Sequence, residues 1–405
     1  MSKYKKIAII GGGAAGLFSS ISSGLHNPKS NIDLFESSSK LLAKLRISGG
    51  GRCNVTNNTL EIKELIKNYP RGSKELISPF NQFSVVDTIN FFQNENIELK
   101  TEPDNRMFPT TDNSETIANC LINKAKELNV KIHFKRKLTK VKYSNNKFKL
   151  FFNNEKEFHI YDKLIITTGG TKSSYDLVSE MGHKIIKLVP SLFSFQIKDP
   201  LIKDISGISF QDIDLKLKVA SKTFKQSGPV LITHWGLSGP ATIKLSAFAA
   251  LELFESDYQA RLFLNFIPQI NKESLINILS NFKISNQKKK LVSEPLFELP
   301  KRFWENLILL NFDKEKTWQE ISKKGIQKLI TQLTEYQMQV SGKGIFKSEF
   351  VTSGGVCLKE INLKTFESKL IPNLFFAGEV LNIDGITGGF NFQAAWTGSW
   401  IAGKN

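Results

Sequence analysis

Residues 5–16 read Lys5-Lys6-Ile7-Ala8-Ile9-Ile10-Gly11-Gly12-Gly13-Ala14-Ala15-Gly16, an apolar run followed by a glycine-rich turn and small residues. This order predicts a strand, a tight turn and a helix, with Gly11, Gly13 and Gly16 in the pattern G-x-G-x-x-G. Gly11 permits the turn, Gly13 lets a pyrophosphate approach the backbone, and Gly16 lets the helix pack closely on the strand. The first N–H groups of such a helix and its dipole favour phosphate.

A second predicted strand, residues 32–35, ends at Glu36, twenty positions after Gly16. An acidic side chain at this place accepts hydrogen bonds from a ribose. The alternative is a tight turn with a purely structural role. We prefer dinucleotide binding, because the motif has a strand before it, a helix after it and an acid at the expected distance.

The length and composition of the chain limit its class. It has 405 residues, of which 40% are hydrophobic, so we expect two or three globular domains. We find no leader and no apolar stretch that could span a bilayer, and therefore expect a cytoplasmic protein without membrane contact. Cys53, Cys120 and Cys357 are scattered and form no C-x-x-C pair, which argues against a metal site or a disulfide framework.

The chain is strongly basic, because 55 Lys and Arg outnumber 38 Asp and Glu, a net charge of +17. Such an excess favours encounter with polyanions, nucleic acid above all. Only seven of the 55 are arginine, and the chain is also rich in Asn and Ile, so biased base composition of a genome would produce the same excess. The charge alone leaves both explanations open.

A second glycine cluster lies in the run Ser48-Gly49-Gly50-Gly51-Arg52-Cys53-Asn54-Val55-Thr56-Asn57, which follows no predicted strand. Three successive glycines lose much chain entropy on ordering, so they need a reason. A backbone pressed against a flat or charged ligand is one reason, and a flexible surface loop is the alternative. We favour the ligand, because Arg52, Cys53 and Asn54 are unusual in a solvated linker.

The stretch from 60 to 170 predicts mixed helices and strands. We expect helices over 60–95 and after a cap at Asn113 or Ser114, and an extended loop over 102–110. Strands are expected near 130–134, 138–144, 147–152, 157–160 and 163–168, of which the second to fourth form an antiparallel meander. The last strand ends at Gly169 and Gly170, at the carboxyl edge where a cofactor lies.

The sequence predicts four segments: residues 1–189 as the first part of the cofactor domain, 190–268 as a β-rich insert, 269–344 as a helical basic insert, and 345–405 as the return to the cofactor domain. Over 270–347, 14 Lys and Arg against 8 Asp and Glu give a net charge of +6. A solvated helical face whose lysines cover apolar surface is the simpler explanation of that charge alone.

The end of the chain predicts where a flavin would lie. A strand over 372–376 is followed by Ala377-Gly378-Glu379, and Gly388 and Gly389 open another helix. An acid at the strand end suits the ribityl hydroxyls of FAD, and the start of the last helix suits the pyrimidine edge of its flavin. A plain NAD enzyme has no need of this element.

These motifs together resemble the BaiN/YhiN-type flavoproteins, also labelled the aminoacetone oxidase family. The resemblance rests on residues 11–16, 48–57, 108–110, 168–170, 233–240, 352–356 and 377–395. It implies an α/β fold, a Rossmann-like FAD-binding domain of the glutathione-reductase type interrupted by a β-barrel-like and a helical insertion. Members of the family are linked to reduction of C=C bonds next to carbonyls, as in bile-acid intermediates, and to dihydrouridine formation in large-subunit ribosomal RNA.

The leading prediction is an FAD-dependent oxidoreductase. NAD(P)H docks transiently and reduces FAD, flavin N5 gives hydride to the β-carbon of a conjugated C=C bond, and a protein acid protonates the α-carbon. Uridine in 23S ribosomal RNA, bound through the basic insert, is the leading substrate. The alternatives are a small-molecule enone reductase, an aminoacetone or amine oxidase, and a non-catalytic FAD-binding protein.

Three residues are candidates for catalysis. Cys53 is the first candidate for the acid, since an ordinary thiol is protonated at neutral pH, and a buried packing role is its alternative. His234 is the second, with a hydrogen-bonded role inside the insert as its alternative. Arg52 could hold a substrate carbonyl or phosphate, or pair with Glu36 or FAD. The predicted cofactor contacts are Gly11, Gly13, Ala14, Ala15, Gly16, Glu36, Lys44, Ser48, Gly49, Gly51, Arg52, Asn54, Val141, Gly169, Gly378, Glu379, Gly388, Gly389, Phe390 and Asn391.

Overall fold

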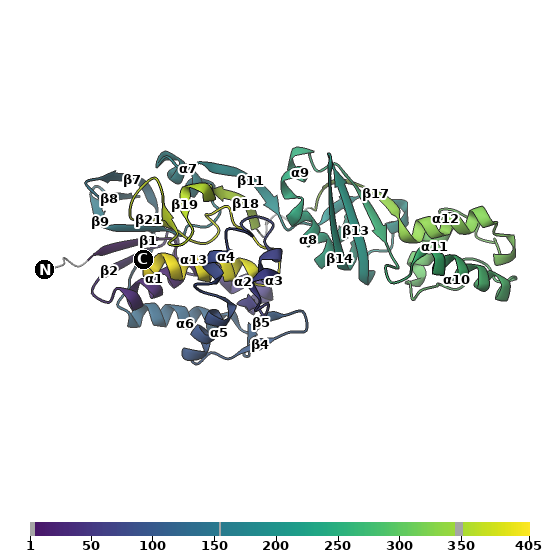
Figure 1. Cartoon of the computed structure of the whole chain (residues 1–405), viewed down its shortest axis with the longest axis horizontal. Helices are drawn as coiled ribbons and strands as arrows, with labels where there is room; N and C mark the ends of the chain where they lie inside the picture. The colour runs from purple at the N-terminus through teal and green to yellow at the C-terminus, as the bar shows by residue number, and fades with distance from the viewer. Residues whose placement is uncertain (1–4, 154, 345–350) are drawn as a thin grey trace. The chain divides into compact units, whose positions relative to one another are not determined.

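The computed structural model describes residues 5–153, 155–344 and 351–405, which fall into two compact units (Figure 1). The first unit joins Met1–Leu188 to Val351–Asn405, and the second, Val189–Phe350, is the stretch inserted between them. The predicted boundary at residue 345 lies outside the described residues.

A seven-stranded sheet forms the centre of the first unit, in the order β19-β20-β21-β10-β1-β2-β6. Its strands are β1 (Lys6–Ile10), β2 (Asn31–Phe35), β6 (Lys131–His133), β10 (Lys163–Ile166), β19 (Ile361–Asn362), β20 (Glu367–Ser368) and β21 (Leu374–Phe376). β21, β10, β1, β2 and β6 run parallel, so their carboxyl ends meet at one edge. All of β1 after Lys6 is buried, as expected of a strand covered on both faces.

Helices from the two ends of the chain pack against each other in this unit, α1 (Ala14–His26) and α13 (Phe390–Lys404). A Cβ on Gly403 would lie 2.6 Å from the Cβ of Ser22, which shows how closely they approach. The other helices are α2 (Ala43–Gly51), α3 (Ile62–Leu65), α4 (Ile77–Phe80), α5 (Val85–Asn94), α6 (Ser114–Glu127) and α7 (Lys172–Glu180).

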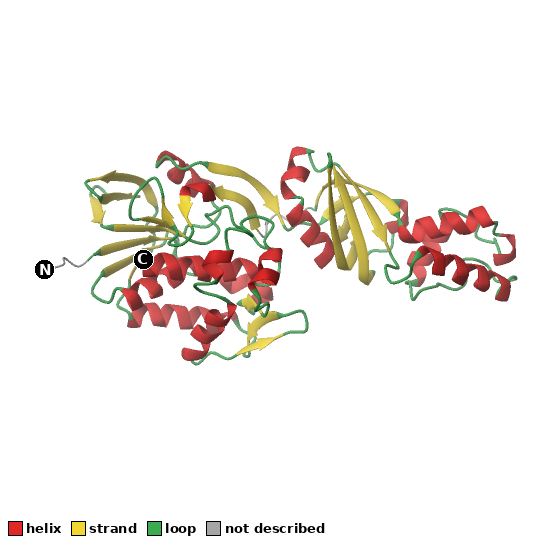
Figure 2. Cartoon of the chain, viewed as in Figure 1, coloured by secondary structure: helices red, strands yellow, loops and turns green. Residues whose placement is uncertain are grey.

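Three small sheets complete the first unit (Figure 2). They are β3 (Thr56–Asn57), β4 (Leu99–Thr101) and β5 (Arg106–Pro109); β7 (Leu138–Ser144), β8 (Lys147–Phe152) and β9 (Phe158–Tyr161); and β11 (Ile185–Ser191) with β18 (Val351–Val356). The predicted meander is confirmed, because β7, β8 and β9 pair antiparallel. The predicted cap is also confirmed, because the Asn113 side chain accepts a hydrogen bond from the Glu115 N–H. The loop over 102–110 is partly a strand, β5.

A closed six-stranded barrel, in the order β12-β15-β14-β13-β16-β17, is the core of the second unit. The strands are β12 (Phe195–Ile197), β13 (Ser209–Val219), β14 (Lys222–Thr233), β15 (Gly236–Ser238), β16 (Ala260–Asn265) and β17 (Tyr336–Lys343). The helices are α8 (Pro240–Phe248), α9 (Ala250–Glu255), α10 (Lys272–Ser285), α11 (Lys301–Leu309) and α12 (Lys323–Thr334). Among the described residues, no helix has both the length and the apolar character needed to cross a bilayer.

One prediction about the inserts needs correction. The segment 190–268, predicted to be β-rich, contains strands β12 to β16 and also two helices, α8 and α9; Pro240 at the first helical position suits the start of α8. The segment 269–344 is not wholly helical, because it ends in β17, which closes the barrel between β16 and β12. Buried Tyr336, Met338 and Val340 alternate with exposed residues there, the period-2 pattern of a strand.

Candidate functional site

The first glycine turn lies at the carboxyl edge of the parallel sheet. Gly11 has φ +109°, and a Cβ there would lie 2.6 Å from the Thr167 carbonyl oxygen. A Cβ on Gly16 would lie 1.7 Å from the Gly11 carbonyl oxygen, so only glycine allows the helix this close to the strand. At Gly13, by contrast, nothing lies within 4 Å of an added Cβ, and no side chain caps the helix. The start of α1 therefore leaves room for an anion.

Glu36 follows β2 and turns toward this loop. Its carboxylate accepts hydrogen bonds from the backbone N–H groups of Gly12 and Ser38, both at 2.7 Å. The Ser37 hydroxyl also donates to this carboxylate, at 3.2 Å. A carboxylate offers about four lone-pair sites, so these three donors still leave acceptor capacity for a ribose hydroxyl. The acid is thus held in place by the same turn that approaches the phosphates.

A second acid, Glu379, follows β21 at the same edge. A Cβ added to Gly169 would lie 3.7 Å from the Glu379 carboxylate, and a Cβ added to Gly170 would lie 3.2 Å from it. The residues that follow β10 therefore face the Glu379 side chain. Lys44 Nζ lies 2.7 Å from Glu379 Oε2 and ties α2 to the cluster. Predicted cofactor residues from three separate segments thus converge here.

Two observations test whether FAD fits this edge. Gly378 has φ +78°, and a Cβ there would approach the Ala15 Cβ to 2.8 Å, so the backbone after β21 lies against the start of α1. Thr168 Oγ1, at the end of β10, is buried and has no hydrogen-bond partner among the described residues. An unsatisfied hydroxyl, an uncapped helix start and two carboxylates match the pyrophosphate, ribose and ribityl groups of FAD. The residues present fit the cofactor.

The second glycine cluster forms a break in α2. Ser48 is extended, whereas Gly49 and Gly50 adopt left-handed φ values of +57° and +70°. A Cβ on Gly49 would lie 2.8 Å from the Phe108 ring, but at Gly50 and Gly51 it would meet nothing within 4 Å. The cluster is therefore packed on one side and bare on the other, which suits a backbone that faces a flat ligand.

Asn54 joins this cluster to the start of α13. In the amide orientation that satisfies both atoms, its nitrogen donates to the Thr56 carbonyl at 3.0 Å and its oxygen accepts from the Gly389 N–H at 2.9 Å. Gly389 has φ +94°, and a Cβ there would lie 2.4 Å from the Thr56 carbonyl oxygen. Asn391 closes the preceding loop, since its side chain accepts from the Gly385 N–H at 2.9 Å and donates to the Gly385 carbonyl at 2.8 Å. The start of the last helix is therefore fixed from both sides.

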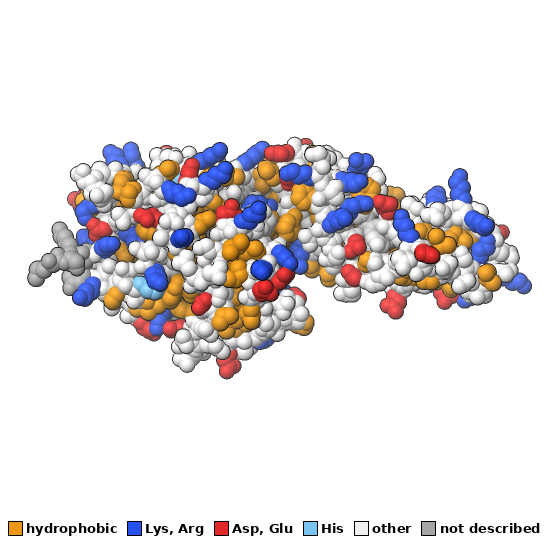
Figure 3. Space-filling model, viewed as in Figure 1, with side chains coloured by type: hydrophobic (Ala, Val, Ile, Leu, Met, Phe, Trp, Pro, Cys, Tyr) orange, Lys and Arg blue, Asp and Glu red, His pale blue; other side chains and the backbone are white. Residues whose placement is uncertain are grey.

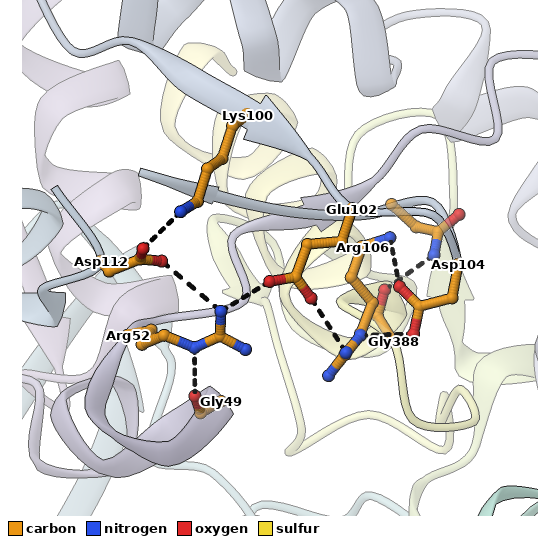
Figure 4. A network of polar contacts seen from close by, with 9 residues as sticks. Gly49, Arg52, Lys100, Glu102, Asp104, Arg106, Asp112 and Gly388 are labelled. Carbon is orange, nitrogen blue, oxygen red and sulfur yellow. Dashed lines mark hydrogen bonds and ion pairs between the residues drawn. The ribbon is translucent and has the colours of Figure 1, made fainter. Parts of the chain in front are cut away.

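Arg52 lies in a network of charged side chains beside this cluster (Figure 4). Its Nη1 donates to Glu102 at 2.6 Å and to Asp112 at 3.5 Å, and its guanidinium carbon lies 4.0 Å from the centre of the Phe108 ring. The Glu102 hydrogen bond raises the pKa of Arg52. Among the described residues its carboxylate partners are these two, so the predicted pairing with Glu36 is wrong.

Glu102 also receives Arg106, whose Nη2 donates to it at 2.9 Å. The acid thus holds two guanidinium groups on the Phe108 ring, at 4.0 and 5.4 Å from its centre. Glu102 and Phe108 were not among the predicted site residues. The charged run Glu102-Pro103-Asp104-Asn105-Arg106, followed by Phe108, is the pattern that could have indicated them.

Cys53 is fully buried and has φ +63°, and its N–H donates to the Ser48 carbonyl at 3.0 Å. Burial raises the pKa of its thiol to about 12, so the thiol is protonated at neutral pH. The protonated thiol suits a proton donor, whereas its complete burial suits a packing role.

The two remaining candidates lie elsewhere. His234 is exposed in the turn between β14 and β15 of the second unit, with Nε2 3.4 Å from Ser206 Oγ. Val141 lies in β7, opposite Leu150 of β8, and belongs to none of the segments described above. The roles of all predicted site residues stay predictions. Among the described residues, no group of three or more His, Cys, Asp or Glu side chains could hold a metal ion.

The description "HI0933-like protein Rossmann domain" is that of a family model that matches residues 5–405. The chain belongs to the HI0933-like family. It is 27% identical over 414 residues to a protein of Escherichia coli strain K12 named ribosomal RNA dihydrouridine synthase, covering 100% of this chain and 98% of that protein. It is 24% identical over 417 residues to a Clostridium scindens protein named 3-dehydro-bile acid delta(4,6)-reductase, covering 98% of each.

A solved structure shows the same fold. The 3-ketosteroid-delta4-(5alpha)-dehydrogenase of Rhodococcus jostii RHA1 matches with a TM-score of 0.52 and 12% identity, over 100% of this chain and 98% of that one. This member of the HI0933-like family has an α/β, Rossmann-type FAD-binding fold and is an FAD-dependent oxidoreductase. The predicted family resemblance, fold class and enzyme class are confirmed.

Proposed function

We propose that this chain reduces a C=C bond conjugated with a carbonyl, with uridine of 23S ribosomal RNA as its substrate and NAD(P)H as electron donor. The observation that carries the proposal is the bare face of Gly50 and Gly51, linked through Asn54 to the uncapped start of α13. Such a face accepts a flat ring system beside helix N–H groups. Bound FAD supplies hydride transfer at its N5.

The chain's own residues would hold the cofactor along its whole length. The start of α1 would bind the pyrophosphate, and Glu36 the ribose. Glu379, held by Lys44, would accept from the ribityl hydroxyls. The N–H groups after Gly389 would stabilise negative charge on the pyrimidine edge of the flavin.

The substrate choice is supported by the names of the relatives. Dihydrouridine is uridine whose C5=C6 bond has gained two hydrogens, and the Escherichia coli relative is named for its synthesis. The net charge of +17 fits a polyanionic substrate. Arg52 is fixed by Glu102 and Phe108 with its side chain about a third exposed, a state that suits a hydrogen bond to a uracil carbonyl or a phosphate.

Proton delivery to the α-carbon is assigned to Cys53 first and His234 second. A thiol with pKa about 12 is fully protonated at pH 7, and His234 is exposed. Cys53→Ala should stop turnover while leaving flavin reduction intact. If Cys53→Ala turns over as wild type does, the residue has a packing role and His234→Ala becomes the deciding variant.

A small-molecule enone reductase is the second candidate, and the name of the Clostridium scindens relative favours it. The experiment that separates the two is mass spectrometry of nucleosides from 23S ribosomal RNA of cells with and without this gene. Loss of dihydrouridine on deletion, restored by wild type but not by a flavin-free variant, supports RNA reduction. An unchanged dihydrouridine content contradicts it and leaves the enone reductase, tested with free conjugated ketones.

A further inference from the structure

Positive charge does not by itself mark an RNA-binding surface on this chain. Lys and Arg side chains are spread over the whole visible face in Figure 3, without one dominant patch. The register of the barrel in the second unit gives a sharper criterion, because it states which side chains stand side by side on the outer face of neighbouring strands.

Two rows of side chains cross four barrel strands, β14, β13, β16 and β17. In the first row Lys225 is opposite Lys216, Lys216 is opposite Phe263, and Phe263 is opposite Gln337. The second row is Thr223, Lys218, Arg261 and Gln339. The residues that alternate with them, Leu215, Leu217, Leu262, Leu264, Met338 and Val340, are buried in the barrel core. The eight side chains therefore face outward, and we call them the Phe263 face.

An aromatic ring stands at the centre of this face between cations. Lys216 Nζ lies 4.8 Å and Lys218 Nζ 5.1 Å from the centre of the Phe263 ring, which is only half-buried. Lys225 and Arg261 flank them and are exposed. Among the residues that the structure describes, Glu335 is the acid that forms an ion pair with this face, 3.0 Å from Lys216, and Asp214 lies at its margin opposite Asn265. Two cations thus lie at the half-buried ring, two more stand beside those cations on the neighbouring strands, and one acid is paired with the face.

Lysine stems often cover an exposed ring with no further role. That explanation accounts for Lys216 and Lys218 but not for exposed Arg261 and Lys225 at either side, nor for Gln337 and Gln339 at the next strand. Three strand spacings separate Lys225 from Gln337, roughly 14 Å. An aromatic platform with cations around it and amides at one side is the arrangement that binds unpaired bases and their phosphates.

We propose that the Phe263 face binds a single-stranded RNA segment. One base stacks on the Phe263 ring. The phosphates are contacted by four cations, Lys216, Lys218, Lys225 and Arg261. Gln337 and Gln339 donate or accept hydrogen bonds to a base or a sugar. The choice of RNA as the polyanion rests on the proposed function. The face is a docking site separate from the residues that hold FAD, and no chemistry takes place on it.

The test is fluorescence anisotropy of a labelled 12-nucleotide oligouridine with the full-length, FAD-loaded protein. Phe263→Leu keeps an apolar side chain but removes the ring, and should raise Kd roughly tenfold. The double variant K216Q/K218Q should lower the slope of log Kd against log salt by about 1.4, two single-strand phosphate contacts. The matched control is K288Q/K289Q, which makes the same charge change on the densest lysine run of the second unit and should alter the slope little.

Opposite results overturn the proposal. If K216Q/K218Q and K288Q/K289Q lose oligouridine affinity equally, binding is driven by charge and has no defined face. If only K288Q/K289Q loses affinity, RNA binds the helical segment. Unchanged oligouridine binding with lost binding of an acidic peptide indicates a protein partner. Phe263→Leu must retain the FAD content and the thermal unfolding temperature of wild type. If it does not, the oligouridine affinity of the double variant K218Q/K225Q, which changes two exposed side chains, decides whether the face binds RNA.

This outcome is distinguishable from failure of the proposed function. If oligouridine binding depends on the Phe263 face but ribosomal dihydrouridine does not depend on the gene, the face stands and the reaction is wrong. If dihydrouridine depends on the gene but the face variants bind oligouridine as wild type does, the reaction stands and the face is wrong.

Discussion

Two helices of the first unit start at glycines, and their starts are built differently. α1 begins at Gly13, where no side chain caps the helix and no atom lies within 4 Å of an added Cβ. α13 begins at Gly389, which is pressed on the Thr56 carbonyl and bound by Asn54. Neither N-cap residue has a side chain that caps its helix, but the start of α13 is in addition braced by Asn54 and by the close approach of Thr56. The same sequence pattern thus gives an open helix start in one case and a braced one in the other.

The largest effect is expected where α1 meets its strand. Gly16→Ala would place a Cβ 1.7 Å from the Gly11 carbonyl oxygen, a backbone atom that cannot move without displacing β1. We expect a loss of about 3 kcal/mol or more in the free energy of unfolding, the upper range for overpacking. Urea unfolding monitored by circular dichroism measures it. A Gly16→Ala protein as stable as wild type would show that the helix does not need this close approach.

The next effect concerns the braces of α13. Asp384, just before its loop, is 1% exposed and accepts from Arg71 Nε at 2.7 Å. Asp384→Ala removes a buried carboxylate that binds the largely buried Arg71 guanidinium, so we expect a loss of about 3 kcal/mol. The exposed pair Glu64–Lys67 provides the control, and Glu64→Ala should cost no more than about 0.5 kcal/mol. Equal costs in the two variants would show that the buried pair does not brace the loop.

The comparison also shows what the sequence can predict. The strand, turn and helix at residues 6–26 were predictable because glycines at fixed spacing between two periodic segments have few other solutions. The brace of α13 was not, because Asn54 and Gly389 lie more than 300 positions apart and their contact depends on tertiary packing. The partner of Arg52 was missed for the same reason, since Glu102 is one of many acids that could reach it.

The inserts show a different limit. The pattern of Tyr336, Met338 and Val340 was present in the sequence, but basic helices around it favoured continued helix. α8 begins with Gly239 and Pro240, a start pattern placed inside a β-rich stretch. In both cases a local pattern was present and its neighbours outweighed it. For the cofactor site, the sequence predicts the segments that contribute residues, but it does not predict which of these segments contact one another in the fold.

The other end of α13 gives a smaller, pH-dependent effect. Lys163 is buried and its Nζ donates to the carbonyls of Ala402 and Gly403 in the last turn, at 2.7 and 3.2 Å. Burial lowers the pKa of Lys163 to about 7, whereas an unfolded chain keeps a lysine pKa of about 10.4. Between these values the unfolded chain binds the additional proton, so the contribution of this group to stability rises with pH.

Lys163→Met removes that titration. The free energy of unfolding of wild type minus that of the variant should therefore increase between pH 7 and 9.5. We expect about 1–2 kcal/mol, because hydrogen bonds to the two carbonyls favour the charged form and offset part of the burial. Urea titrations at both pH values measure it. A difference that is constant or falls with pH would mean that Lys163 is charged throughout.

The smallest effect on stability, and the sharpest on the cofactor, is expected at Gly13. Gly13 has φ −81°, a value that any residue can adopt. Of the described glycines that lie outside the left-handed region, it is the one at which an added Cβ would meet nothing within 4 Å. Gly13→Ala should change the free energy of unfolding of the flavin-free protein by no more than about 0.5 kcal/mol, because the weaker cap and the stiffer unfolded chain offset each other. The added methyl group would instead occupy the space proposed for the pyrophosphate, so the Kd for FAD should rise at least tenfold.

The reverse pattern is expected for Asn271→Ala, which removes the cap of α10 in the second unit, where Asn271 accepts from the Ser274 N–H at 2.8 Å. That variant should lose about 1 kcal/mol of stability and keep its FAD affinity. Flavin fluorescence titration and urea unfolding of both proteins measure the two quantities side by side. If Gly13→Ala binds FAD as tightly as wild type, the accessible start of α1 is not a phosphate site, and the contrast with the braced start of α13 loses its functional meaning.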